Sequence, residues 1–215
     1  MKIKFTIFFL AITLAMPGIA QDEKAVKLLN ELSSKTKAYD NFSANFTMNL
    51  VDLQSDIDLK REGKITVSDD MYRVKLDDDV IISNGDTRWT YQAESNEVYV
   101  DYEVEDDASG INPSKIFTIW ESGFKQSHGG TATVKGRTVD QINLHPIKAA
   151  ETNYHTVKVF VDAQKIELVK VEVVGKEGDT YIYELLDFKN NQTLSDGTFE
   201  FNKANFPGVE VVDLR

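Results

Sequence analysis

The residue types that most often carry catalysis or metal binding are sparse in this chain and widely spaced. Its three histidines, His128, His145 and His155, do not occur at the spacing of a metal site or beside a nucleophile motif. There is no cysteine, no glycine-rich phosphate loop and no Gly-x-Ser-x-Gly turn. The sequence therefore predicts a protein that is not an enzyme and that needs no metal or other cofactor.

Carboxylates are the one abundant reactive group. The acidic run from Asp101 to Asp107 offers oxygen ligands for calcium, but it lacks the spacing of a dedicated calcium loop, so we interpret it as a solvated loop. A carboxylate pair for glycoside hydrolysis stays open as a remote alternative, since no particular pair is indicated. The net charge of −11, without a basic stripe, argues against nucleic acid and anionic lipid surfaces as partners.

The N-terminus indicates where the protein works. A basic start precedes an almost wholly apolar stretch, Phe5 to Met16, which is too short to span a membrane as a helix. Small residues follow, so we expect a secretory signal peptide that is cut after Ala20, and export of the mature chain. Gln21 stands where a bacterial lipoprotein would have its acylated cysteine. We therefore expect residues 21–215 to form one unanchored domain.

The spacing of apolar residues changes after this leader. Residues Asp22 to Tyr39 have apolar side chains three and four apart, which predicts a helix. From Phe42 to Leu50 every second residue is apolar, which predicts a half-buried strand. Turn signals such as Asn84-Gly85 separate the later runs of the same kind.

These later runs predict a mainly β fold with about ten or eleven strands in one large curved antiparallel sheet. A sheet of this size is expected to twist and curl towards a barrel. The further strands are expected at 59–67, 71–76, 80–83, 88–92, 97–102, 131–135, 138–145, 154–162, 166–174 and 180–188, followed by a closing hairpin through Pro207-Gly208.

One segment interrupts the strands. It runs from Asn112, which can cap a helix, to Phe124, just beyond Gly123, which can end one. A short helix here would be apolar over much of its circumference. With the N-terminal helix it would lie across the curved sheet, either as a lid over an apolar cavity or as a plug that fills the space as ordinary core. The pattern leaves both alternatives open.

Several motifs, in order along nearly the whole mature chain, resemble the outer-membrane lipoprotein carrier (LolA) family. The stretch 83–91, with Ser83-Asn84-Gly85 and Trp89-x-Tyr91, is similar to a hairpin of that family, and 63–67 to its preceding strand. Phe199-x-Phe201 and Pro207-Gly208-Val209 are similar to its closing hairpin. The segment 112–124 occupies the position of the family's lid.

The resemblance implies an unclosed antiparallel barrel with a helical lid over an apolar cavity. It also implies a periplasmic carrier that shields the acyl chains of lipoproteins. Such a carrier takes its cargo from an inner-membrane ABC-type releasing complex and delivers it to an outer-membrane acceptor. We expect a monomer. A periplasmic sensor or regulator that binds lipid or lipoprotein with the same fold is the alternative.

Alternation along the strands indicates which side chains would line the cavity. The expected set is Phe46, Met48, Leu50, Ile65, Val67, Trp89 and Tyr91 from the strands, with Ile116, Phe117, Ile119 and Trp120 from the lid. An error of one residue in register would exchange the two faces of any strand.

The family pattern is broken at one place. After the strand that corresponds to 63–67, the family usually has a basic residue followed by proline, and the basic residue is thought to latch the lid. Residues 67–73 lack this pair. Arg61 and Arg73 are the candidates for a substitute latch.

Overall fold

The alternating runs between Phe42 and Phe188 all form strands in the structure, a computed structural model of the chain. It describes residues 18–52, 54–103 and 117–215, with residues 18–22 described by their backbone only. The strands are β1 (Phe42–Asp52), β2 (Ile57–Ser68), β3 (Met71–Leu76), β4 (Asp79–Ser83), β5 (Thr87–Gln92), β6 (Glu97–Tyr102), β7 (Phe124–Val134), β8 (Arg137–Pro146), β9 (Tyr154–Asp162), β10 (Glu167–Gly175), β11 (Asp179–Asn190) and β12 (Glu210–Asp213).

All twelve strands belong to one sheet, in the order β12-β6-β5-β4-β3-β2-β1-β11-β10-β9-β8-β7. Every neighbouring pair is antiparallel except β12 and β6, which run parallel. The sheet does not close on itself, because β12 and β7 remain its two edges. The predicted fold class, one large unclosed antiparallel sheet, is confirmed, with slightly more strands than the ten or eleven expected.

Strand β1 lies in the middle of this sheet and joins its two halves. It pairs with β2 over its whole length, from Phe42 opposite Val67 to Asp52 opposite Ile57. It pairs with β11 on its other side, with one bulge between Asn45 and Phe46. The face to which each β1 side chain points therefore determines which residues of the neighbouring strands point to the same face, in both halves of the sheet.

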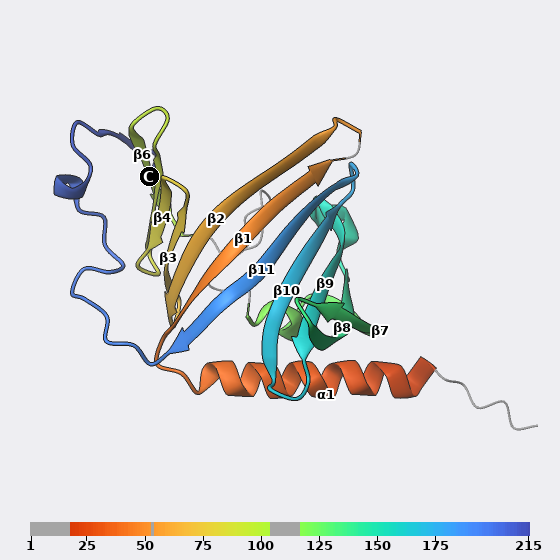
Figure 1. The fold of residues 1–215 in the computed structure, drawn as a ribbon. Coiled ribbons are helices and arrows are strands. Elements are labelled where there is room, and N and C mark those ends of the chain that lie inside the picture. The colour runs from red at the N-terminus through yellow and green to blue at the C-terminus, as the bar shows by residue number, and fades with distance from the viewer. Residues whose placement is uncertain (1–17, 53, 104–116) are drawn as a thin grey trace, which may run out of the picture.

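The one α-helix of the described residues, α1 (Gly18–Lys37), crosses the strands at one end of the sheet (Figure 1). Its buried side, which includes Leu28, Leu29 and Leu32, packs on one face of the sheet, which we call the inner face. At this end, called proximal here, the Lys35 Nζ donates to the carbonyl of Lys165 in the turn between β9 and β10 (2.7 Å).

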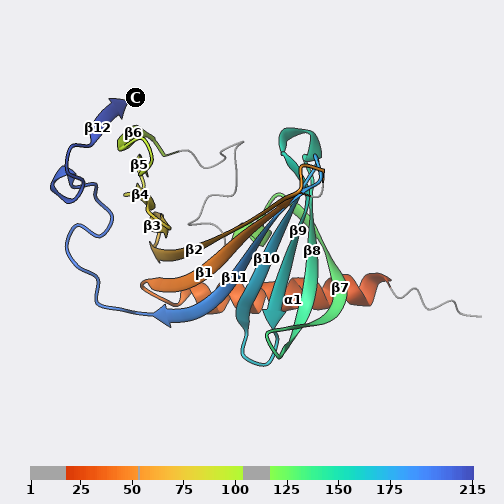
Figure 2. The ribbon, with the colours of Figure 1, turned by 45° about the horizontal axis from the view of Figure 1, so that its top comes forward.

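The opposite, distal end gathers three connections as the strands converge (Figure 2). Gln54, in the β1–β2 turn, donates from Nε2 to the carbonyl of Glu177 in the β10–β11 turn (3.0 Å). The N–H of Lys176 donates to the carbonyl of Asn153, just before β9 (2.9 Å). These bonds hold the distal turns to one another.

The C-terminal segment passes over the other face of the sheet, called the outer face. Phe206 packs against Tyr91 of β5, with ring centroids 4.5 Å apart, and Arg73 of β3 donates from Nη1 to the carbonyl of Thr198 (3.4 Å). The predicted hairpin between 199–201 and 209–215 is wrong. Only the second part is a strand, β12, and it pairs with β6 because the N–H of Glu210 bonds to the carbonyl of Asn96 (3.1 Å).

Two predicted segments fall partly outside the described residues. Of the expected lid, 112–116 lie outside, Ile119–Glu121 form a single 3₁₀ turn, and Phe124 is already part of β7. Of the expected signal peptide, only residues 18–20 are described. They open α1, so that the helix begins before the predicted cleavage site and ends two residues earlier than expected.

Gly63, on β2, lies directly beneath the ring of Phe46. A Cβ at position 63 would be 2.4 Å from Phe46 Cζ and 2.9 Å from the carbonyl oxygen of Lys75. We therefore expect Gly63→Ala to lower the free energy of unfolding by about 1–3 kcal/mol in urea denaturation, as overpacking does. In a Phe46→Leu background the loss should be smaller by at least about 0.5 kcal/mol, and equal losses in both backgrounds would contradict this contact.

Candidate functional site

The inner face of the sheet carries the largest group of apolar side chains in the described residues. Strand β1 contributes Phe42, Ala44, Phe46 and Met48, all buried, because alternate residues of a strand point to the same side. The neighbouring strands add buried side chains to the same cluster, among them Ile65, Val67, Tyr72, Val74, Ile142, Leu144, Val157, Val159, Val161, Val171 and Val173.

Most of the residues expected to line a cavity come together on this face. Phe46, Met48, Ile65, Val67, Phe117 and Trp120 are buried in the one cluster, and Ile119 packs against it half-buried. Leu50 is half-buried and lies farther along β1, toward the distal end. Ile116 lies outside the described residues.

Trp89 and Tyr91 do not join this group, contrary to the prediction. On β4, Ile81 faces the inner cluster opposite Thr90, so the alternate residues Ile82 and Val80, opposite Trp89 and Tyr91, face outward. Tyr91 packs there against Phe206 of the C-terminal segment. Its hydroxyl bonds to Asn96 Oδ1 (3.2 Å). The alternation of β5 was predicted correctly, but its two faces were exchanged.

At the proximal end the inner face is closed by side chains. Trp120 is almost fully buried and its Nε1–H donates to Ser33 Oγ (2.7 Å) and to the carbonyl of Leu29 (3.2 Å), both on α1. Phe117 packs on Phe42 with ring centroids 4.5 Å apart. Here the alternative of a plug describes the arrangement better than a lid over a hollow.

Toward the distal end the inner face remains apolar, while α1 lies over the other end (Figure 1). Leu50 is paired with Leu59 on β2 and with Tyr181 on β11, and Met48 is paired with Tyr183. Burial, and next the neighbouring Tyr181, raise the pKa of Tyr183 to about 12. A tyrosine with the ordinary pKa of 10.0 is already neutral at physiological pH, and the raised pKa extends this neutrality to more alkaline solution.

The two arginines proposed as latches have other partners. Arg61, on the inner face, donates from Nε to Asp77 Oδ2 (2.8 Å) and from Nη2 to Asp79 Oδ2 (2.7 Å). This guanidinium holds the pKa of the Asp77 carboxyl below its usual range. Arg73 lies on the outer face against Thr198, which argues against its contacting a lid on the inner face. For Arg61 the latch stays a prediction.

A partly buried ion pair fixes the first half of α1 to the sheet. Lys24 Nζ lies 2.5 Å from Asp140 Oδ1, and His128 Nε2 lies 2.7 Å from the same oxygen. The N–H of Gly130 donates to His128 Nδ1 (3.3 Å), which leaves Nε2 as the donor to Asp140. Burial works to raise the pKa of the Asp140 carboxyl, but the bonds from Lys24 and His128 outweigh burial and lower it.

Sequence reasoning missed this cluster and the distal part of the inner face. Lys24, His128 and Asp140 are far apart in the chain, and no local pattern marks ion pairs of this kind. Tyr181 and Tyr183, in contrast, belong to a run whose alternation was recognised, so that their place on one face could have been predicted.

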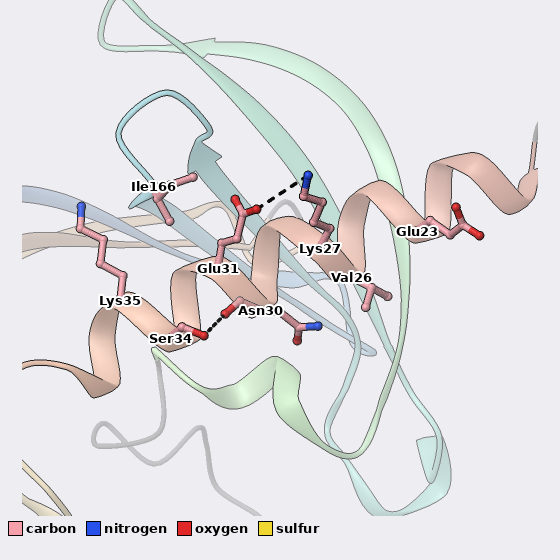
Figure 3. A pocket seen from close by; sticks show the side chains of 8 residues that line it. All are labelled: Glu23, Val26, Lys27, Asn30, Glu31, Ser34, Lys35 and Ile166. Atoms are coloured by element: carbon pink, nitrogen blue, oxygen red, sulfur yellow. Dashed lines mark hydrogen bonds and ion pairs between the residues drawn. The ribbon is translucent and has the colours of Figure 1, made fainter.

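A shallow groove follows the side of α1 that faces away from the inner cluster. Its volume is about 890 Å³, and its lining residues are Glu23, Val26, Lys27, Asn30, Glu31, Ser34, Lys35 and Ile166 (Figure 3). Lys27 and Glu31 form an ion pair at 3.9 Å within it. The lining combines four charged and two neutral polar side chains with two aliphatic ones. It is distinct from the apolar surface on the inner face.

Neither a metal site nor a membrane-spanning helix is found among the described residues. In these parts of the chain no three His, Asp or Glu side chains group together in a way that could hold a metal ion. No described helix is both long enough and apolar enough to cross a bilayer.

Comparison with known families identifies the fold. A family model for the outer membrane lipoprotein carrier protein LolA matches residues 39–202. The chain belongs to the LolA family. The match covers β1 to β11 and most of the segment that leads to β12.

Solved structures resemble this LolA-family chain at low sequence identity, and no curated protein sequence matches it. An uncharacterized conserved protein from Thermus thermophilus has the same fold, with a TM-score of 0.56, 7% identity, and coverage of 87% of this chain and 98% of that one. A putative outer membrane lipoprotein-sorting protein domain from Vibrio parahaemolyticus has a TM-score of 0.48, 14% identity, and coverage of 86% and 99%. The lipoprotein LppX of Mycobacterium tuberculosis has a TM-score of 0.48, 12% identity, and coverage of 80% and 99%.

The Asp140 cluster makes a testable contribution to stability. Asp140→Asn should lower the free energy of unfolding by about 1–3 kcal/mol at neutral pH, because it weakens a buried, charge-assisted bond. The folded-state pKa of Asp140 is depressed, so its stabilisation is present above the ordinary value of 3.8 and is lost as the pH falls below it. Denaturation curves of the two proteins should therefore converge in acid.

Asp187→Asn provides the control for this measurement. Asp187 is an exposed carboxylate that accepts a bond from Asn45 Nδ2 (3.1 Å) on the outer face of the sheet, opposite to the face that α1 covers. Its substitution should change stability by less than about 0.5 kcal/mol. A pH-independent loss in Asp140→Asn would show that the charge on Asp140 is not what stabilises the helix.

Proposed function

We propose that this protein is a periplasmic carrier that shields the acyl chains of lipoproteins and transports these lipoproteins from the inner to the outer membrane. The observation that carries the proposal is an apolar inner face, in a LolA-family sheet, that continues past α1 toward the distal end. The surface from Met48 through Leu50 to Leu59 offers aliphatic contacts without an unpaired charge.

The physical need for such a surface follows from the cargo. Burying an acyl chain is worth about 0.8 kcal/mol per methylene group, so an acylated protein does not leave a bilayer for water unaided. A carrier replaces the bilayer by its own apolar side chains. It must also release the chain, which requires that bound and free states differ by a modest free energy.

The proposed cycle follows from the LolA-family assignment and the sequence. The chain would be exported by its N-terminal signal, and residues 21–215 would act as one domain and as a monomer. It would receive acylated lipoproteins from an inner-membrane ABC-type releasing complex and pass them to an outer-membrane acceptor. Its role is binding, and no catalytic step is proposed for any residue.

The direct test is release of a lipoprotein from membranes. Membranes that contain the releasing complex and a labelled lipoprotein are incubated with the purified protein and ATP, and the soluble fraction is examined for a complex of the two. A soluble complex is expected. If the labelled lipoprotein never leaves the membrane in the presence of this protein, the carrier function is wrong.

Substitutions at two neighbouring residues of β1 can test whether the ligand binds the inner or the outer face. Leu50 and Val51 are both half-buried, but point to opposite faces. Leu50→Asn should weaken binding of an alkyl probe by about 5–30-fold, as the loss of 1–2 kcal/mol of apolar contact predicts, measured by fluorescence titration. Val51→Asn should bind as the wild type does. Equal effects would place the binding surface elsewhere.

A further inference from the structure

Burial along β2 changes from one end of the strand to the other although its inner-facing residues are nearly all apolar. At the proximal end Ile65 and Val67 are 5% and 3% exposed. At the distal end Ile57 and Leu59, which face the same side by alternation, are 42% and 48% exposed. The inner face therefore changes from core to an open apolar surface within one strand.

The exposed residues continue the inner cluster without a break. Leu59 pairs with Leu50 of β1, and Leu50 in turn with Tyr181 of β11. Tyr181 pairs with Val173 of β10, which belongs to the buried cluster. Apolar side chains on four adjacent strands thus connect the distal rim with the interior.

Arg61 is the one charged residue in this part of the inner-facing row of β2, and its side chain is bonded to neighbouring strands. Arg61 lies between Leu59 and Gly63 in that row, and its guanidinium is bound by Asp77, Asp79 and the carbonyl of Leu76 (2.8 Å). These partners belong to β3, β4 and their turn, so the guanidinium is drawn toward β3, away from Leu50 on β1. The aliphatic track over β1 therefore runs from Met48 to Leu50. Asp52, the next residue of β1 that faces the same side, accepts bonds at the rim from the N–H groups of Gln54 (2.8 Å) and Ser55 (3.2 Å).

The proximal end offers no comparable opening in the described residues. Trp120 is bonded to Ser33 and Leu29, and Lys24 is bonded to Asp140. An alkyl chain that entered here would have to break these bonds and leave buried polar groups without partners, which is unfavourable for each group. At the distal end the turns are tied to one another by hydrogen bonds, and none of these bonds involves Leu59.

We propose that the alkyl chain of the ligand enters and leaves the inner face at the distal end, over Ile57 and Leu59. The inference rests on the proposed function and adds the direction of loading to it. The chain end slides from Leu59 over Leu50 toward Met48 and Tyr183. The polar part of the ligand stays outside, near the distal turns. Exposed aliphatic side chains at the rim supply the first contacts for methylene groups that leave water.

The rate of binding tests the direction. The probe is a dansyl amide with a long saturated alkyl chain, neutral so that the acidic turn residues Asp56 and Glu177 do not repel it. In stopped-flow fluorescence, Leu59→Asn should lower the association rate constant about fivefold or more, as expected for about 1 kcal/mol of lost contact. The matched control is Leu186→Asn, because Leu186 is 49% exposed but lies at the bulge between β1 and β11, near the proximal end.

The outcomes separate the two proposals. Slower association in Leu59→Asn, with wild-type rates in Leu186→Asn, supports loading at the distal end. Equal association rates in all three proteins overturn it while the binding function stands. Failure of the wild type to bind the probe at all removes the binding function itself, and the loading route with it.

The orientation of the bound chain gives a second, independent measurement. Because the chain has no cysteine, Leu59→Cys, Tyr183→Cys and Leu186→Cys each allow labelling with a single bimane fluorophore. Methyl esters of stearic acid with a nitroxide near the ester or near the terminal methyl serve as quenchers. The label at 59 should be quenched more by the nitroxide near the ester, the label at 183 more by the one near the methyl, and the label at 186 by neither. The reverse order at 59 and 183 would overturn the proposal.

Discussion

The pleat of β1 is the constraint on which the rest of this structure depends. The strand is hydrogen-bonded along its whole length to β2 on one side and β11 on the other, so its alternation is transmitted to both halves of the sheet. A shift of one residue would move Phe42, Ala44 and Phe46 from the inner face to the outer one, and bring Ser43 and Asn45 under α1. The cost of burying those polar groups fixes the register.

The inner face is covered by α1 and the outer face by the C-terminal segment. This difference explains why the sequence pattern places Trp89 and Tyr91 of β5 on the wrong face. The sequence around Trp89 and Tyr91 alternates clearly, and a strand was correctly predicted. Alternation gives two sets of residues but does not state which set faces α1. That choice follows from pairing with β4 and from Phe206, more than a hundred residues later, which covers Tyr91 on the outer face. No local pattern contains this information.

The same reasoning applies to the C-terminus. Two apolar runs separated by Pro207-Gly208 are consistent with a hairpin, but each run could equally pair with another strand at an exposed edge of the sheet. The structure pairs β12 with the free edge of β6 in parallel, while Phe201 stacks on Phe206 at 5.0 Å instead of joining a strand. The sequence therefore predicted strand positions, the sheet and the apolar character of β1 and β2, whereas partners distant in sequence decided faces, edges and ion pairs. Lys24 and Asp140, separated by 116 residues, belong to the last group.

The proposed carrier function requires both strong binding and ready release of acyl chains, and the unequal covering of the inner face bears on both requirements. The proximal half, with Trp120 and Phe117 packed under α1, has the properties of ordinary core, where each displaced side chain would leave a cavity or an unpaired polar group. In the distal half, Leu59 and Tyr181 lie next to turns that are hydrogen-bonded to one another. Departure of a bound chain would cost little free energy here, because these side chains would be exposed to water only in part. An acyl chain bound there would gain less free energy per methylene than in a closed cavity. This smaller binding free energy makes the chain dissociate more readily. It also lowers the excess affinity that an acceptor would need in order to take the cargo from this protein.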